Sequence, residues 1–131
     1  MAYIEFKHIT KVFPGQKALD DVSFAINRGE IHAIIGENGA GKSTLLNILH
    51  GAFPASSGEI TFDGKPVHFS GTADAIKFGI AKVHQEIISI PEMTVAENLF
   101  LGKEPGAGAF LNKRKMNDEA QRILSRLQTD I

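Results

Sequence analysis

The stretch Gly36-Glu37-Asn38-Gly39-Ala40-Gly41-Lys42-Ser43-Thr44 decides the fold class of this 131-residue chain. Residues 36–43 match the pattern G-x-x-x-x-G-K-[ST], in which a glycine-rich loop holds phosphate groups. Glycines leave backbone N–H groups open to anionic oxygens, and a helix that follows adds free N–H groups and the positive end of its dipole. We therefore predict that this loop binds the phosphates of a nucleotide.

Three side chains at the end of the loop have expected roles of their own. Lys42 supplies a mobile positive charge to the β- and γ-phosphates, and the Ser43 hydroxyl is suited to ligate Mg²⁺. Thr44 adds a further hydroxyl. The alternative, a plain glycine turn before a helix, does not explain why the full pattern lies between an apolar run and a helical one.

The segments around the loop predict an α/β fold. Ile31 to Ile35 is short, apolar and rich in β-branched residues, which is typical of a central strand buried on both faces. Lys42 to His50 has the spacing of a helix, which Gly51 can end. Ile80 to Val83 is a second apolar run, and we expect it to be another buried strand.

The N-terminal segments predict an antiparallel β subdomain. Tyr3 to Val12 and Leu19 to Ile26 roughly alternate apolar and polar residues, and Pro14-Gly15 between them is typical of a turn. A second hairpin is expected around Asp63-Gly64. These two hairpins predict a small sheet beside the phosphate loop.

The second half of the chain is expected to be mainly helical. Helices are predicted for Thr72 to Phe78 and for Thr94 to Leu101, and Gly102 to Gly108 is expected to be a mobile loop. Asn117 is predicted to cap a final helix with one apolar face. The residues of that face are Ala120, Ile123, Leu124 and Leu127.

Composition narrows the class of partner. Fourteen Lys and Arg against fifteen Asp and Glu give a net charge of −1, which argues against a nucleic-acid partner held by bulk charge. The absence of cysteine excludes disulfides and thiolate metal sites, and the five histidines lack ligand spacing. Because no apolar run is long enough to span a bilayer, membrane association is expected to be peripheral.

The amino-acid sequences of several segments resemble segments of the ATPases of ABC transporters. Gly36 to Leu46 is similar to the Walker A segment of that family, and Val12-Phe13-Pro14-Gly15 looks like the start of its first β-hairpin. Ile80 to Glu86 resembles its Q-loop. Thr94 to Gly102 is most similar to the ATPases of bacterial carbohydrate importers of the ribose, xylose and galactose type.

The resemblance covers essentially the whole chain and implies a fold. Residues 1–131 correspond to the N-terminal part of an ABC ATPase nucleotide-binding domain. The expected architecture is an incomplete P-loop NTPase core with an N-terminal antiparallel β subdomain. Residues from about 86 to 131 would form the Q-loop and the beginning of the helical subdomain.

The resemblance also implies a set of site residues. Phe13 matches the aromatic residue that stacks on adenine, although its spacing alone fits a core residue or a hairpin anchor equally well. Gln85 matches the glutamine whose side-chain oxygen approaches Mg²⁺ and the attacking water, although such a residue is usually a solvated loop residue. The expected magnesium ligands are Ser43 and Gln85. The expected ATP-binding residues are Phe13, Gly36, Glu37, Asn38, Gly39, Ala40, Gly41, Lys42, Ser43, Thr44 and Gln85.

The function that the resemblance implies is ATP hydrolysis that drives sugar import through a membrane permease. Expected partners are the permease subunits, a second ABC half-site or the rest of the domain and, indirectly, a sugar-binding protein. The expected location is the cytoplasmic face of the membrane. The sequence lacks an L-S-G-G-Q segment and a Walker B strand, so this chain alone is expected to bind ATP without hydrolysing it. A non-hydrolytic nucleotide-binding module and a fragment of a soluble ABC protein are the alternatives.

Overall fold

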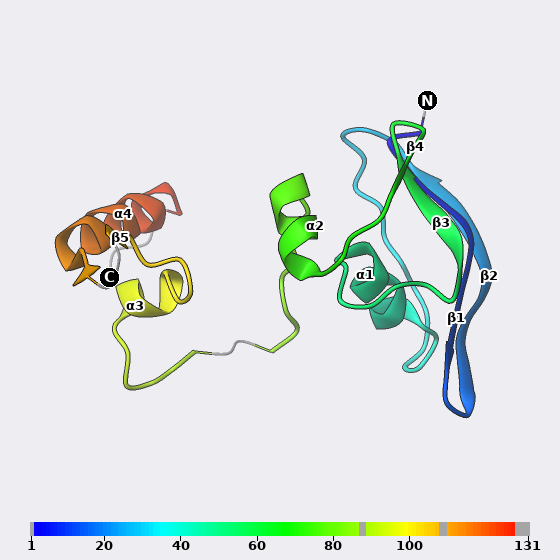
Figure 1. The fold of residues 1–131 in the computed structure, drawn as a ribbon, viewed down its shortest axis with the longest axis horizontal. Coiled ribbons are helices and arrows are strands. Elements are labelled where there is room, and N and C mark those ends of the chain that lie inside the picture. The colour runs from blue at the N-terminus through cyan, green and yellow to red at the C-terminus, as the bar shows by residue number, and fades with distance from the viewer. Residues whose placement is uncertain (1, 87–88, 108–109, 128–131) are drawn as a thin grey trace. The chain divides into compact units, whose positions relative to one another are not determined.

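The computed structural model describes residues 2–86, 89–107 and 110–127. Contacts divide the chain into two compact units, residues 1–83 and residues 84–131 (Figure 1). The first contains β1 to β4 with α1 and α2, and the second contains α3, β5, β6 and α4. Among the helices described in these ranges, none is long and apolar enough to cross a membrane.

The first unit is built on an antiparallel sheet in the order β2-β1-β3-β4. Its strands are β1 (Ile4–Phe13), β2 (Gln16–Ile26), β3 (Ser57–Phe62) and β4 (Lys65–Val67). The predicted turns join them: Gly15 has φ 81° between β1 and β2, and Asp63 and Gly64 have φ 48° and 74° between β3 and β4. The predicted antiparallel β subdomain is therefore confirmed.

Helix α1 (Lys42–Leu49) covers one face of this sheet (Figure 1). Its buried side chains, Leu45 and Ile48, belong to the core of the first unit. Helix α2 (Thr72–Phe78) ends at Gly79, which has φ 111°, as the sequence predicts. Because α1 begins immediately after the glycine-rich loop, packing of α1 on the sheet fixes the end of that loop. The core residues are Phe6, Ile9, Leu19, Leu45, Ile48, Ile60 and Phe62.

A bulge interrupts the pairing of the two longest strands. His8 and Asp21 both have φ 52°, a left-handed conformation that few side chains adopt, and the register of β1 shifts there. The two side chains contact each other, with 2.6 Å between His8 Nδ1 and Asp21 Oδ1. Gly58 of β3 passes so close that a Cβ atom on it would lie 2.3 Å from the His8 carbonyl oxygen. The bulge therefore requires glycine at position 58.

The prediction of two buried parallel strands is wrong for the described structure. Residues 31–35 and 80–83 have no strand assignment. The exposed fractions of Ile31, Ile35 and Val83 are 99%, 93% and 96%. A β-branched run favours an extended backbone, but a strand also needs a neighbour to complete its hydrogen bonds. The described sheet is antiparallel throughout and offers these two segments no neighbour.

The second unit is a small helical body. Helix α3 (Val95–Leu99) packs with α4 (Lys113–Arg126), and its buried core is Ala96, Met116 and Ala120. A two-residue strand β5 (Gly106–Ala107), inside the expected loop, pairs with β6 (Phe110–Leu111). The predicted cap of the last helix is wrong: α4 begins at Lys113, and the Asn112 side chain accepts the N–H of Lys115. Asn117 therefore lies within the helix.

Candidate phosphate-binding site

The glycine-rich loop has the backbone conformation that its glycines permit. Gly39 and Gly41 have φ values of 87° and 95°, in the left-handed region. Gly41 is the N-cap of α1 and provides no side-chain cap, so the first N–H groups of the helix are not satisfied by a capping side chain. Residues 36–40 are exposed. The loop thus presents backbone donors and a helix N-terminus to solvent, which suits an anion.

Gly41 also lies directly against the β subdomain. A Cβ atom at this position would lie 2.5 Å from the Ala18 carbonyl oxygen and 2.7 Å from Leu19 Cδ2. Both neighbours belong to β2, and Leu19 is a buried core residue. The second glycine of the motif is therefore required both by its φ angle and by the close approach of β2.

The ammonium group of Lys42 lies within the loop. Its Nζ atom donates to the carbonyl oxygens of Gly36 and Glu37, at 2.5 and 2.6 Å. An ammonium group has three donors, so one remains for an anionic oxygen. The loop therefore holds a positive charge beside the free N–H groups of the α1 N-terminus.

The other predicted residues of the loop start α1. Ser43 is exposed and Thr44 is half-buried in its first turn. A hydroxyl oxygen is a ligand type that Mg²⁺ accepts, so Ser43 fits its expected role. Gln85 is exposed and belongs to the other unit, residues 84–131, so its predicted contact with the same ion stays a prediction.

Phe13 lies at the end of β1, where the first hairpin turns. Its half-buried ring meets that of Phe53 edge to face, with centroids 5.5 Å apart and planes at 83°. Lys11 Nζ lies over the Phe13 ring, 5.2 Å from its centroid. The ring is therefore a packed anchor of the hairpin, and its predicted stacking on adenine stays a prediction.

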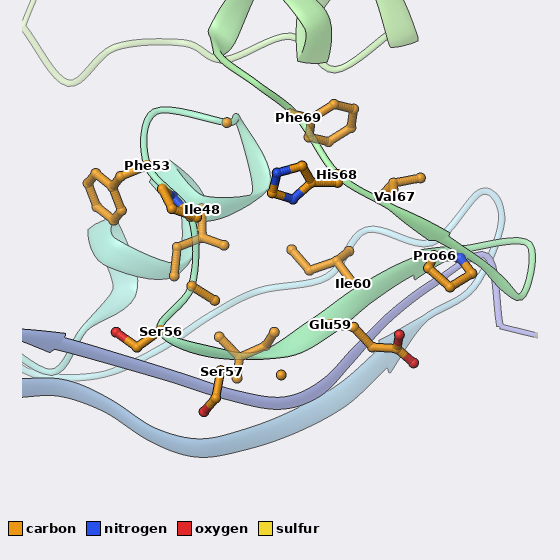
Figure 2. A pocket seen from close by; sticks show the side chains of 15 residues that line it. Ile48, Phe53, Ser56, Ser57, Glu59, Ile60, Pro66, Val67, His68 and Phe69 are labelled. Atoms are coloured by element: carbon orange, nitrogen blue, oxygen red, sulfur yellow. The ribbon is translucent and has the colours of Figure 1, made fainter.

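One pocket of the first unit contains predicted site residues, and a larger one does not. A pocket of about 250 Å³ is lined by Ala40, Gly41 and Lys42 together with residues of β2 and of the 32–35 segment. A larger one of about 410 Å³ is surrounded by Ile48 of α1, Ile60 of β3 and His68 (Figure 2), and no predicted site residue lines it. The smaller pocket borders the loop, but its lining is mostly apolar, so the exposed loop itself is the candidate phosphate site.

A carboxylate–imidazole pair beside this pocket is not predicted from the sequence. Glu30 Oε1 lies 2.7 Å from His32 Nδ1, and the His32 ring, which lines the pocket, stacks on Phe24. The hydrogen bond from His32, and then those from Asn27, lower the pKa of Glu30. The pair holds the start of the segment that leads into the loop. Its only signal in the sequence is the spacing Glu-x-His.

Comparison with known proteins agrees with this geometry. Residues 19–131 match the ABC transporter family. The arabinose import ATP-binding protein AraG of Pectobacterium atrosepticum is 51% identical over 98% of this chain and 25% of its own length. The xylose import ATP-binding protein XylG of Thermoanaerobacter pseudethanolicus is 48% identical over 98% of this chain and 26% of its own length. The chain thus spans about a quarter of the length of these curated relatives.

Solved structures show the same relationship. A nucleotide-free ATP-binding cassette from an ABC transporter superposes with a TM-score of 0.80 at 35% identity, over 98% of this chain and 55% of that one. The ADP conformation of an ATP-binding cassette gives a TM-score of 0.69 at 39% identity, over 79% of this chain and 41% of that one. The α/β, P-loop NTPase class predicted from the loop is confirmed by these neighbours. The chain belongs to the ABC transporter family.

Proposed function

We propose that residues 36–44 bind the phosphates of Mg-ATP and that the chain is the ATP-binding front part of an ATPase that powers sugar import. The observation that carries this proposal is the joint geometry of Gly41 and Lys42. Gly41 is held against β2 at the start of α1, and the Lys42 ammonium lies within the loop beside it. Backbone donors and a fixed cation converge on one exposed loop, which is the arrangement that a polyphosphate requires.

Each site residue has a defined task in this proposal. The loop N–H groups and Lys42 hold phosphate oxygens, and Phe13 stacks on the adenine. Ser43 and Gln85 would hold Mg²⁺, which offsets phosphate charge when bound. Hydrolysis also needs groups that orient water and stabilise charge on the γ-phosphate from the other side. We therefore assign binding to this chain and hydrolysis to the complete protein.

The sugar-import part of the proposal rests on the relatives. Proteins named for arabinose and xylose import are about half identical to this chain along nearly all of it. A putative ribose/galactose/methyl galactoside import ATP-binding protein of Halalkalibacterium halodurans is 47% identical. We infer a carbohydrate importer, with permease subunits, a second ABC half-site and a sugar-binding protein as partners. The chain would then work at the cytoplasmic face of the membrane.

Substitution of Lys42 tests the proposed phosphate site. Lys42→Ala should weaken Mg-ATP binding by at least about tenfold, because a charge-assisted contact to phosphate contributes roughly 1.5–3 kcal/mol. Calorimetric titration measures the affinity. Lys77→Ala, which removes an exposed lysine of α2 away from the loop, is the control variant. Equal affinities for Lys42→Ala and the unsubstituted chain would overturn the assignment.

A further inference from the structure

Lys11 lies among two phenyl rings and a backbone carbonyl group. Its Nζ atom is 5.2 Å from the centroid of Phe13 and 4.8 Å from the centroid of Phe53, and it donates to the Pro54 carbonyl oxygen at 2.6 Å. The two rings contact each other edge to face. We call Lys11, Phe13, Phe53 and Pro54 the lysine–aromatic cluster.

The cluster ties the tip of the first hairpin to the segment that follows α1. Pro54 is 43 residues from Lys11 in the sequence. Two further hydrogen bonds fasten the same contact: Ser56 N–H donates to the Thr10 carbonyl at 2.8 Å, and Val12 N–H donates to the Ser56 hydroxyl at 3.0 Å. The end of β1 is thus held by the chain that leaves α1, the helix whose other end carries the phosphate loop.

These contacts restrict the Phe13 ring. The ammonium of Lys11 lies over one of its faces, and the Phe53 ring packs against it at 83°. A purine that stacks on Phe13 would use the face that Lys11 does not cover. A ring already held in one orientation loses less rotamer freedom when a ligand stacks on it, so the cluster favours binding without touching the ligand.

We propose that Lys11 and Phe53 are positioning residues for the nucleobase: they hold the Phe13 ring in an orientation in which the face away from Lys11 accepts a purine. This inference rests on the proposed function of the phosphate loop and on the stacking role of Phe13. It assigns base affinity to two residues outside the Walker A segment. Neither Lys11 nor Phe53 contacts the phosphates in this proposal. Binding of the base therefore depends on the lysine–aromatic cluster, and binding of the phosphates depends on the glycine-rich loop.

The experiment compares two ligands that share phosphates and differ in the base. The 131-residue chain is titrated with Mg-ATP and with Mg-tripolyphosphate, which has no base or ribose. Lys11→Met keeps the aliphatic stem and removes the charge, and Phe53→Leu keeps apolar volume and removes the ring. Lys17→Met, which removes an exposed lysine of the same hairpin that pairs with Asp20, is the matched control.

Lys11→Met and Phe53→Leu should each weaken ATP binding by about threefold, as expected for loss of a ring contact, and leave tripolyphosphate binding within twofold. In a Phe13→Ala background they should have no further effect, because the ring they position is gone. Equal losses for both ligands, unchanged ATP binding, or additive losses with Phe13→Ala would overturn the positioning role. No tripolyphosphate binding by the unsubstituted chain would instead overturn the phosphate site.

Discussion

At the scale of single residues, Gly41 is the point at which the phosphate loop lies against β2 of the β subdomain. Gly41→Ala should destabilise the first unit by about 2 kcal/mol or more, because strain at positive φ adds to a contact with the Ala18 carbonyl that backbone movement must relieve. Gly39→Ala is the control: its φ is also positive, but an added Cβ meets nothing within 4 Å, so we expect about 1 kcal/mol.

Urea unfolding of the two alanine variants measures this difference. Mg-ATP titration should show a larger loss for Gly41→Ala as well, because the start of α1 has to shift. Equal unfolding free energies for the two variants would show that the approach of β2 does not constrain the loop.

At this scale, the sequence predicts the roles of residues that act together with their neighbours along the chain. The motif around Lys42 is local, and the structure shows that its ammonium lies within the loop. The hydrogen bond of Lys11 to Pro54 joins residues that are 43 positions apart, so it cannot be predicted from the residues next to Lys11 in the sequence. The role of Gln85 as a ligand of the same ion as Ser43 stays a prediction.

At the scale of elements, the start of α3 is a reciprocal cap that responds to pH. The Thr94 hydroxyl accepts the Glu97 N–H, and the Glu97 carboxylate accepts the Thr94 N–H at 2.9 Å. The hydrogen bonds from Thr94, with a smaller contribution from Lys113, lower the pKa of Glu97. A lowered folded-state pKa means that the unfolded segment binds more protons in acid. The cap therefore stabilises α3 above the ordinary carboxyl pKa of about 4.3 and loses strength as the pH falls through the lower folded value.

Glu97→Gln tests the charge in this cap. The amide can still accept the Thr94 N–H but does not titrate near pH 4, so the helicity of α3 should lose its acid-dependent part. Backbone chemical shifts of α3, recorded between pH 7 and pH 2, measure the helicity. The same acid transition in both proteins would show that another group controls this helix.

The elements that the sequence predicts best are those with local start and stop signals. Asp63-Gly64 and Gly79 have the positive φ values that their turn and helix end require. The predicted start of α4 at Asn117 is wrong because two asparagines are possible caps, and among the described hydrogen bonds it is Asn112 that accepts an N–H. The strand predicted for residues 31–35 is wrong because strand pairing depends on a second segment elsewhere in the chain. An apolar run favours an extended backbone but does not show which segment would pair with it.

At the scale of the whole molecule, the unpaired segment 31–35 predicts self-association. Extended apolar chain with free N–H and C=O groups is a template for pairing with a second chain. Ile31→Lys should lower the average mass measured by sedimentation velocity, because a lysine disfavours strand addition. Ile76→Lys, on the exposed side of α2, makes the same change of charge outside any extended segment. Equal sedimentation of the two variants would exclude residue 31 from the contact.

The loop at residues 36–44 is the central claim for the whole molecule, and amide chemical shifts test it most directly. Adding Mg-tripolyphosphate to ¹⁵N-labelled chain should shift the amides of Gly39, Gly41, Lys42 and Ser43 most, because these N–H groups would donate to phosphate oxygens. The shifts should be lost in Lys42→Ala. No shift in this loop, or the largest shifts around His68 at the larger pocket, would contradict the account.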